Sequence, residues 1–71
     1  MLNETLEENI RLTKKEIEKA DIMIGFFRWM AEREEKDKEK SATYKVKADQ
    51  LEASKKVNEL FLEYAKEHAE E

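Results

Sequence analysis

The sequence contains neither cysteine nor proline, and it has one glycine, one histidine and one tryptophan among its 71 residues. Without cysteine the chain forms no disulfide and offers no thiolate to a metal ion. A chain of this length makes one small domain, in a size range where burial of apolar surface roughly offsets the loss of chain entropy. We therefore treat residues 1–71 as a single domain and expect self-association or a partner chain to add stability.

Long apolar runs and a leader-like start are missing as well. No apolar run approaches the roughly 20 residues that span a bilayer, and the opening residues MLNE are polar and acidic, unlike a secretory signal. Between residues 20 and 32 the only basic residue is Arg28, whereas a helix that lies on a membrane surface usually has a basic polar face. These features predict a cytoplasmic protein that does not bind a membrane.

What the chain does contain favours helix almost throughout. Glutamate, lysine, alanine and leucine are frequent, and these side chains lose little rotamer freedom in a helix. Apolar residues recur at steps of three and four up to Ala31, stop across the charged segment EREEKDKEK and resume after Ser41. This interruption indicates two helices joined by a turn, because one long coiled coil would keep its apolar positions.

We therefore predict an all-α fold, an antiparallel two-helix hairpin with helices at about residues 3–38 and 43–69. Asn3 is the predicted N-cap of the first helix, and Ser41 or Thr43 that of the second. Two such hairpins would pair into a homodimeric four-helix bundle with coiled-coil packing.

The predicted core of the hairpin consists of the apolar positions that share one face of each helix. In the second helix a broad face is favoured over a smaller one formed by Tyr44, Leu51 and Leu62. The core residues are then Leu6, Ile10, Ile17, Ile24, Phe27, Val57, Leu60, Phe61 and Tyr64.

The stretch ADIMIGFFRWMAE has more apolar residues than one partner helix can cover. A helix that is apolar nearly all round is normally buried on several sides. Gly25 costs about 1 kcal/mol in a helix interior relative to alanine, which predicts close approach of another helix or ring. The predicted dimer interface or partner-binding surface consists of Ile22, Met23, Gly25, Phe26, Arg28, Trp29 and Met30.

No motif for catalysis, a cofactor or a metal ion is present in the sequence. A bundle-core dimetal site needs a glutamate three residues before a histidine, but Ala65 precedes the single histidine, His68, at that distance. His68 and Glu71 share a helical face, although a solvated histidine at a helix C-terminus is the simpler interpretation. We predict a protein that is not an enzyme.

Nucleic-acid binding is an alternative because small helical hairpins can dimerise into RNA-binding bundles. Its candidate surface is a lysine-bearing face formed by Lys45, Lys47, Lys55 and Lys56. The net charge of the whole chain is −4, whereas a phosphate-binding surface normally shows a sustained basic stripe. Nucleic acid is therefore the less favoured partner.

The segment DKEKSATYKVKADQLEASKKVNEL, residues 37–60, resembles small helical-hairpin proteins of bacteriophages and related mobile elements. It shares with them a charged turn followed by Tyr44, Ala48, Leu51 and Val57 along the second helix. The resemblance implies a compact all-α protein in the cytoplasm of a host cell that binds another protein, such as a host or defence component. It implies no particular functional residues.

The predicted function is that of a small protein-interaction module. As an inhibitor or adaptor it would occlude the surface of a partner with a rigid helix face. A nucleic-acid-binding dimer and a purely structural, self-assembling bundle are the alternatives.

Overall fold

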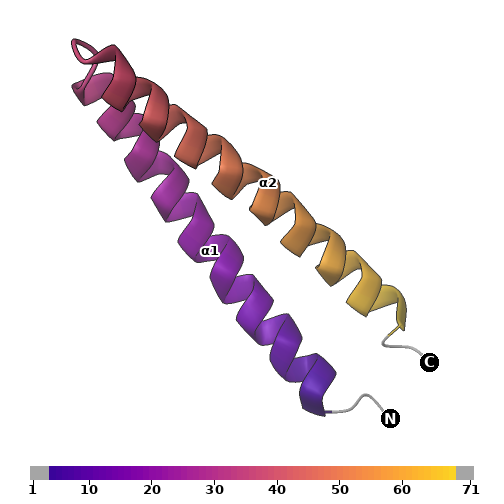
Figure 1. Ribbon diagram of the computed structural model, residues 1–71. Coiled ribbons are helices and arrows are strands. Elements are labelled where there is room, and N and C mark those ends of the chain that lie inside the picture. The colour runs from indigo at the N-terminus through magenta and orange to yellow at the C-terminus, as the bar shows by residue number, and fades with distance from the viewer. Residues whose placement is uncertain (1–3, 69–71) are drawn as a thin grey trace.

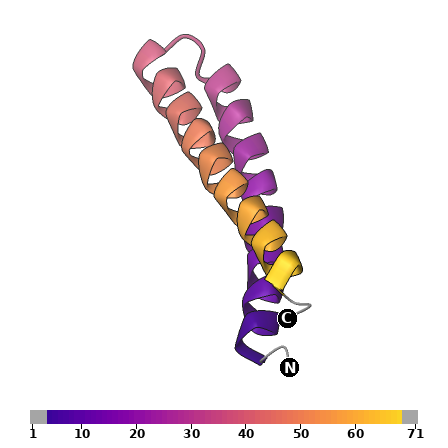
Figure 2. The same ribbon diagram turned by 90° about the vertical axis from the view of Figure 1, so that its right-hand side faces the viewer.

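The computed structural model describes residues 4–68 as two long helices joined by a short turn. Helix α1 spans Glu4–Arg33 and helix α2 spans Lys38–His68. The helices run antiparallel and side by side, so that the start of α1 and the end of α2 lie at the same end of the molecule (Figures 1 and 2). The prediction of an all-α hairpin is confirmed. The predicted N-cap Asn3 lies outside the described residues.

The turn covers residues 34–37 and comes earlier than the sequence predicts. α1 ends at Arg33 and α2 begins at Lys38, so both predicted helix boundaries at the turn were wrong by five residues. The backbone N–H of Asp37 donates to the carbonyl of Glu34 at 2.9 Å, a three-residue spacing that tightens the chain as it leaves α1.

Asp37 acts as the N-cap of α2. Its Oδ1 accepts a hydrogen bond from the backbone N–H of Lys40 at 3.2 Å, and its carbonyl accepts one from the N–H of Ser41 at 2.9 Å. The carboxylate also lies at the positive end of the helix dipole. Ser41 and Thr43 were therefore wrongly predicted as N-caps: both lie inside α2, where the Thr43 hydroxyl donates to the carbonyl of Glu39.

Removing this cap should destabilise the start of α2. Asp37→Ala leaves the N–H of Lys40 without its side-chain acceptor, so we expect the free energy of unfolding to fall by about 1 kcal/mol. Urea unfolding followed by circular dichroism measures the change. Glu35→Ala, in the same turn but ahead of the cap, is the matched control. An equal loss in both variants would contradict the capping role.

The seam of α1, the row of side chains that face α2, follows the predicted spacing. Ala20, Ile24 and Ala31 are buried, and Phe27 packs against the cluster that Ala20 and Ile24 form with Ala48 of α2. The rest of the row is half-buried. The predicted core positions of the first helix lie in this row: Ile24 is buried, and Leu6, Ile10, Ile17 and Phe27 are half-buried.

α2 turns a different face toward α1 from the predicted one. Its buried residues are small: Ser41, Ala48 and Ala65. Its half-buried residues are Tyr44, Leu51, Lys55, Asn58, Phe61 and Leu62. Val57, Leu60 and Tyr64 are 65, 62 and 54% exposed, so their prediction as hairpin core was wrong. Phe61, the fourth α2 residue predicted for the core, is half-buried.

Complementary side-chain size explains why α2 packs through this face. Ala48 is buried against Ile24, and a small residue opposite a large one lets two helices approach closely. Next to this contact, the Phe27 ring stacks on Tyr44 with centroids 6.1 Å apart. The buried Ser41 hydroxyl donates to the carbonyl of Ala31 at 2.9 Å, a bond between helices that fixes their relative register near the turn.

Candidate functional site

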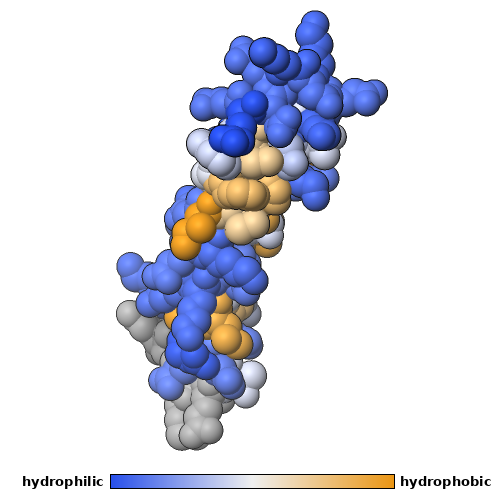
Figure 3. Space-filling view, turned by 90° about the vertical axis from the view of Figure 1, so that its left-hand side faces the viewer, coloured by the Kyte–Doolittle hydropathy of each residue, from blue (hydrophilic) through white to orange (hydrophobic). Residues whose placement is uncertain are grey.

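A group of large apolar side chains lies on the side of α1 that points away from α2. Ile22, Phe26 and Trp29 are 72, 45 and 52% exposed. Together with Gly25 they follow the spacing i, i+3, i+4 and i+7, which aligns them along one side of a helix. We call these four residues the α1 outer face. Figure 3 shows an orange apolar patch near the turn end of the hairpin, bordered above and below by blue hydrophilic side chains.

Aromatic contacts join the α1 outer face to the seam. The ring centroid of Phe26 lies 6.4 Å from that of Trp29 and 5.4 Å from that of Phe27, within the range of favourable aromatic pairs. Arg33 places its guanidinium carbon 5.2 Å from the Trp29 ring centroid, a cation–π distance. The exposed rings are therefore held by neighbours on both sides.

Gly25 contributes no side chain to the α1 outer face, and the space around it is open. Apart from its two chain neighbours and the backbone of its own helix, a Cβ built at Gly25 meets no atom within 4 Å, so packing inside the hairpin does not require glycine here. Glycine nevertheless costs about 1 kcal/mol in a helix relative to alanine. The position is three residues after Ile22 and four before Trp29, so Gly25 lies on the same side of the helix as these two large side chains.

Three other residues predicted for the interaction surface lie outside the α1 outer face. Met23 and Met30 are half-buried and lie between this face and the seam of α1. Arg28 instead reaches α2, where its Nη2 is 2.6 Å from Oε1 of Glu52. The sequence could not show this ion pair because its carboxylate comes from the other helix.

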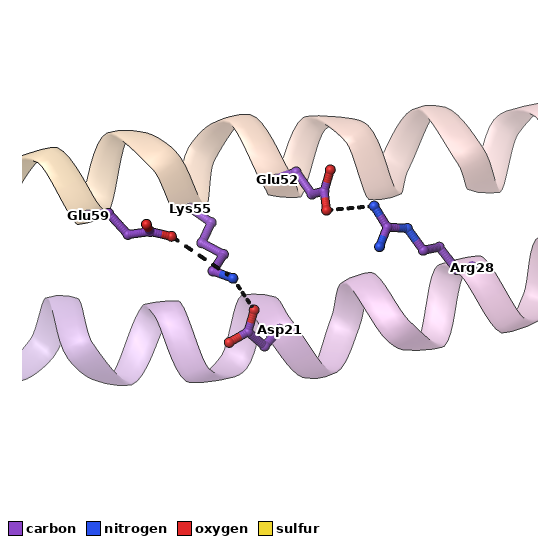
Figure 4. A network of polar contacts seen from close by, with 5 residues as sticks. All are labelled: Asp21, Arg28, Glu52, Lys55 and Glu59. Atoms are coloured by element: carbon purple, nitrogen blue, oxygen red, sulfur yellow. Dashed lines mark ion pairs between the residues drawn. The ribbon is translucent and has the colours of Figure 1, made fainter.

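Ion pairs bridge the two helices along one flank of the hairpin (Figure 4). Beside the Arg28–Glu52 pair, Nζ of Lys55 lies 2.6 Å from Oδ1 of Asp21 and 4.0 Å from Oε1 of Glu59. The hydrogen bond with Asp21 raises the pKa of Lys55 above its ordinary value. Exposed ion pairs contribute at most about 1 kcal/mol each. These pairs therefore affect the relative orientation of α1 and α2 more than the free energy of unfolding.

α2 exposes a second apolar surface, and three of its four residues were predicted to lie in the core. It consists of Val46, Val57, Leu60 and Tyr64, which we call the α2 outer stripe. This stripe is less continuous than the α1 outer face. Ten residues separate its first two members, and Leu60 shares a surface depression with Lys56, Glu59 and Glu63.

The four lysines of the alternative nucleic-acid surface do not gather on one face. Lys55 is half-buried at the seam and paired with Asp21. Lys47 lies 5.7 Å from the Phe27 ring centroid, on one flank of α2, whereas helix geometry places Lys45 and Lys56 on the other. The lysines therefore form no sustained basic stripe of the kind that binds phosphates.

No protein family model, curated protein or solved structure matches this chain. The resemblance of residues 37–60 to phage helical hairpins stays a prediction.

Residues 4–68 contain no group of three potential metal ligands, and neither of their helices is long and apolar enough to cross a bilayer. His68 stacks on the Tyr64 ring with centroids 4.0 Å apart, and its Nδ1 lies 2.9 Å from the Tyr64 carbonyl oxygen. Glu71, its predicted neighbour, lies outside the described residues.

Proposed function

We propose that this chain is a small protein-binding module that acts through the α1 outer face. The observation that carries the proposal is the exposure of Ile22, Phe26 and Trp29 on the side of α1 that its own partner helix does not cover. Tryptophan and other large aromatic residues supply much of the energy in protein interfaces when a partner desolvates them.

The spacing of these residues matches a known way of recognising a helix. Ile22, Phe26 and Trp29 stand at i, i+4 and i+7, the anchor positions of an amphipathic helix that lies in an apolar groove. The hairpin holds α1 in helical form before binding, so little conformational entropy is lost on association. A partner whose own working surface includes such a groove would be blocked by occlusion, as an inhibitor requires.

Truncating the two aromatic anchors should weaken association without unfolding the hairpin. We expect the double variant Phe26→Ala, Trp29→Ala to lose about 2–4 kcal/mol of binding free energy, because both rings lose their contact with the partner. Its helix content should stay unchanged, since both residues are exposed on the hairpin. Circular dichroism measures the helix content of the purified chain.

Photocrosslinking tests whether the face binds a polypeptide. With p-benzoylphenylalanine in place of Phe26, irradiation should give a covalent adduct of defined mass, and Ile22→Ala with Trp29→Ala in the same chain should remove it. The same probe at Asp49, which is exposed on α2, is the control. If the probe at position 26 gave no more adduct than the control, the proposal would be wrong.

A further inference from the structure

α2 has two rows of residues with the same spacing, and one of them faces α1. The row that faces α1 runs from Ser41 to Ala65 in alternating steps of three and four, and all its members are buried or half-buried. Each residue of the α2 outer stripe comes two positions after a member of that row. The outer stripe therefore follows the same period on a different side of the helix.

We propose that α2 has a second register against α1, displaced by two residues, and that the interhelical ion pairs hold the hairpin in the observed register. Two residues of an α-helix correspond to a rise of about 3 Å and a rotation of about 200°. Such a slide toward the turn, with that rotation, brings each residue of α2 to the place of the residue two positions before it. We call this arrangement the shifted register.

The shifted register would bury larger apolar side chains than the observed one. Lys55 and Asn58 are half-buried in the row that faces α1. Val57 and Leu60, which are 65 and 62% exposed, would take their places. Burial of apolar surface alone would thus favour the shifted register, which is why the sequence pattern predicts Val57 and Leu60 for the core.

Two contacts of the observed register oppose the shift. Gln50 would take the place of Ala48, which is 1% exposed and packs beside Ile24, where a larger side chain meets little free space. Asp37 would lose its position as N-cap, because the turn would extend from residues 34–37 to residues 34–39. These costs and the apolar gain are of similar size, so weaker interactions can decide between the two registers.

The ion pairs between the helices are specific to the observed register. Nη2 of Arg28 lies 2.6 Å from Oε1 of Glu52, and Nζ of Lys55 lies 2.6 Å from Oδ1 of Asp21 (Figure 4). In the shifted register a serine and a valine would take the places of Glu52 and Lys55, so both pairs would be lost. Charged and polar side chains that fix one register of packed helices are a known device.

The ion pairs thereby control which apolar surface α2 presents. In the shifted register Val57 and Leu60 would face α1, whereas Tyr44 and Leu62 would move to places that are now exposed. α1 keeps its outer face in both registers, so the inference does not depend on the proposed function.

Disulfide trapping measures the two registers, because the chain has no cysteine of its own. The Ser41 hydroxyl donates to the carbonyl of Ala31, so Ala31→Cys with Ser41→Cys should link in the observed register. Ala31→Cys with Thr43→Cys should link in the shifted register. In a glutathione buffer at equilibrium, the ratio of the two extents of disulfide formation follows the populations of the registers.

Neutralising one carboxylate of each pair should favour the shifted register. Asp21→Asn with Glu52→Gln keeps the size of both side chains and removes the attraction in both pairs. The ratio of the 31–43 to the 31–41 disulfide should then rise roughly tenfold. Glu7→Gln with Glu18→Gln, at exposed positions of α1, changes the net charge equally and should leave the ratio unchanged.

A second set of positions shows whether the whole helix moves. Ala20 and Leu51 line one depression between the helices, so Ala20→Cys with Leu51→Cys reports the observed register. Ala20→Cys with Ala53→Cys reports the shifted one. The ratio at these positions should rise by the same factor as the ratio near the turn, with the helix content by circular dichroism nearly unchanged.

Three results would overturn the inference. An unchanged ratio in the neutralised chain, or an equal rise in the control chain, would show that the ion pairs do not select the register. A rise confined to the positions near the turn would indicate local fraying of α2 without a second register. A loss of helix content in the neutralised chain would show that the pairs stabilise the fold instead. The photoprobe at position 26 tests the proposed function separately in each case.

Discussion

Replacing Ile24 with alanine is expected to lower the free energy of unfolding by about 2–5 kcal/mol. Ile24 is 5% exposed and lies in the buried cluster with Ala20 and Ala48, so truncation leaves a cavity where the helices meet. A domain of this size has only a few kcal/mol of stability. The variant should therefore be largely unfolded at 25 °C, which circular dichroism during a thermal scan would show.

Ile22→Ala is the matched control for this prediction, because it makes the same change two residues away on the same helix. Ile22 is 72% exposed, so Ile22→Ala should change the free energy of unfolding by less than about 0.5 kcal/mol. Equal destabilisation of the hairpin by both substitutions would contradict the assignment of seam and outer face.

The second large effect is expected from enlarging a small residue of the α2 seam. Ala48 is 1% exposed, and leucine at this position would force the helices apart or push neighbouring side chains out of their rotamers. We expect Ala48→Leu to cost about 1–3 kcal/mol. Urea unfolding measures the loss of stability, and the change in ring packing near Phe27 should be visible by nuclear magnetic resonance.

Ala53→Leu is the control for Ala48→Leu, because Ala53 is exposed on the same helix. It should leave the stability of the monomer nearly unchanged. The opposite ranking, with Ala53→Leu the more damaging of the two, would restore the face that includes Val57 and Leu60 as the true seam.

Helix content and the α1 seam could be predicted because both depend on local sequence. Good helix formers fill the chain, and Ile10, Ile17 and Ile24 mark one face by size as well as by spacing. The excess of apolar residues on α1 was visible for the same reason, and its members Ile22, Phe26 and Trp29 are exposed in the hairpin.

The α2 seam and the turn could not be predicted because they depend on the other helix. Ala48 and Ser41 carry little hydrophobic signal, yet they are buried because they fit against larger side chains of α1. Val57 and Leu60 carry a strong signal and remain outside. The turn contains neither glycine nor proline, so its position depends on the cap supplied by Asp37, one acidic residue among many.

The two apolar surfaces lie on opposite sides of the hairpin, so the molecule has two separate places at which a partner could bind. The α1 outer face and the α2 outer stripe point away from each other, so a partner that covers one leaves the other in water. When a partner already covers one surface, a further contact through the other surface would join such complexes one after another into longer assemblies. The charged side chains around Leu60 limit such growth, because burying them in a contact through the α2 outer stripe is unfavourable.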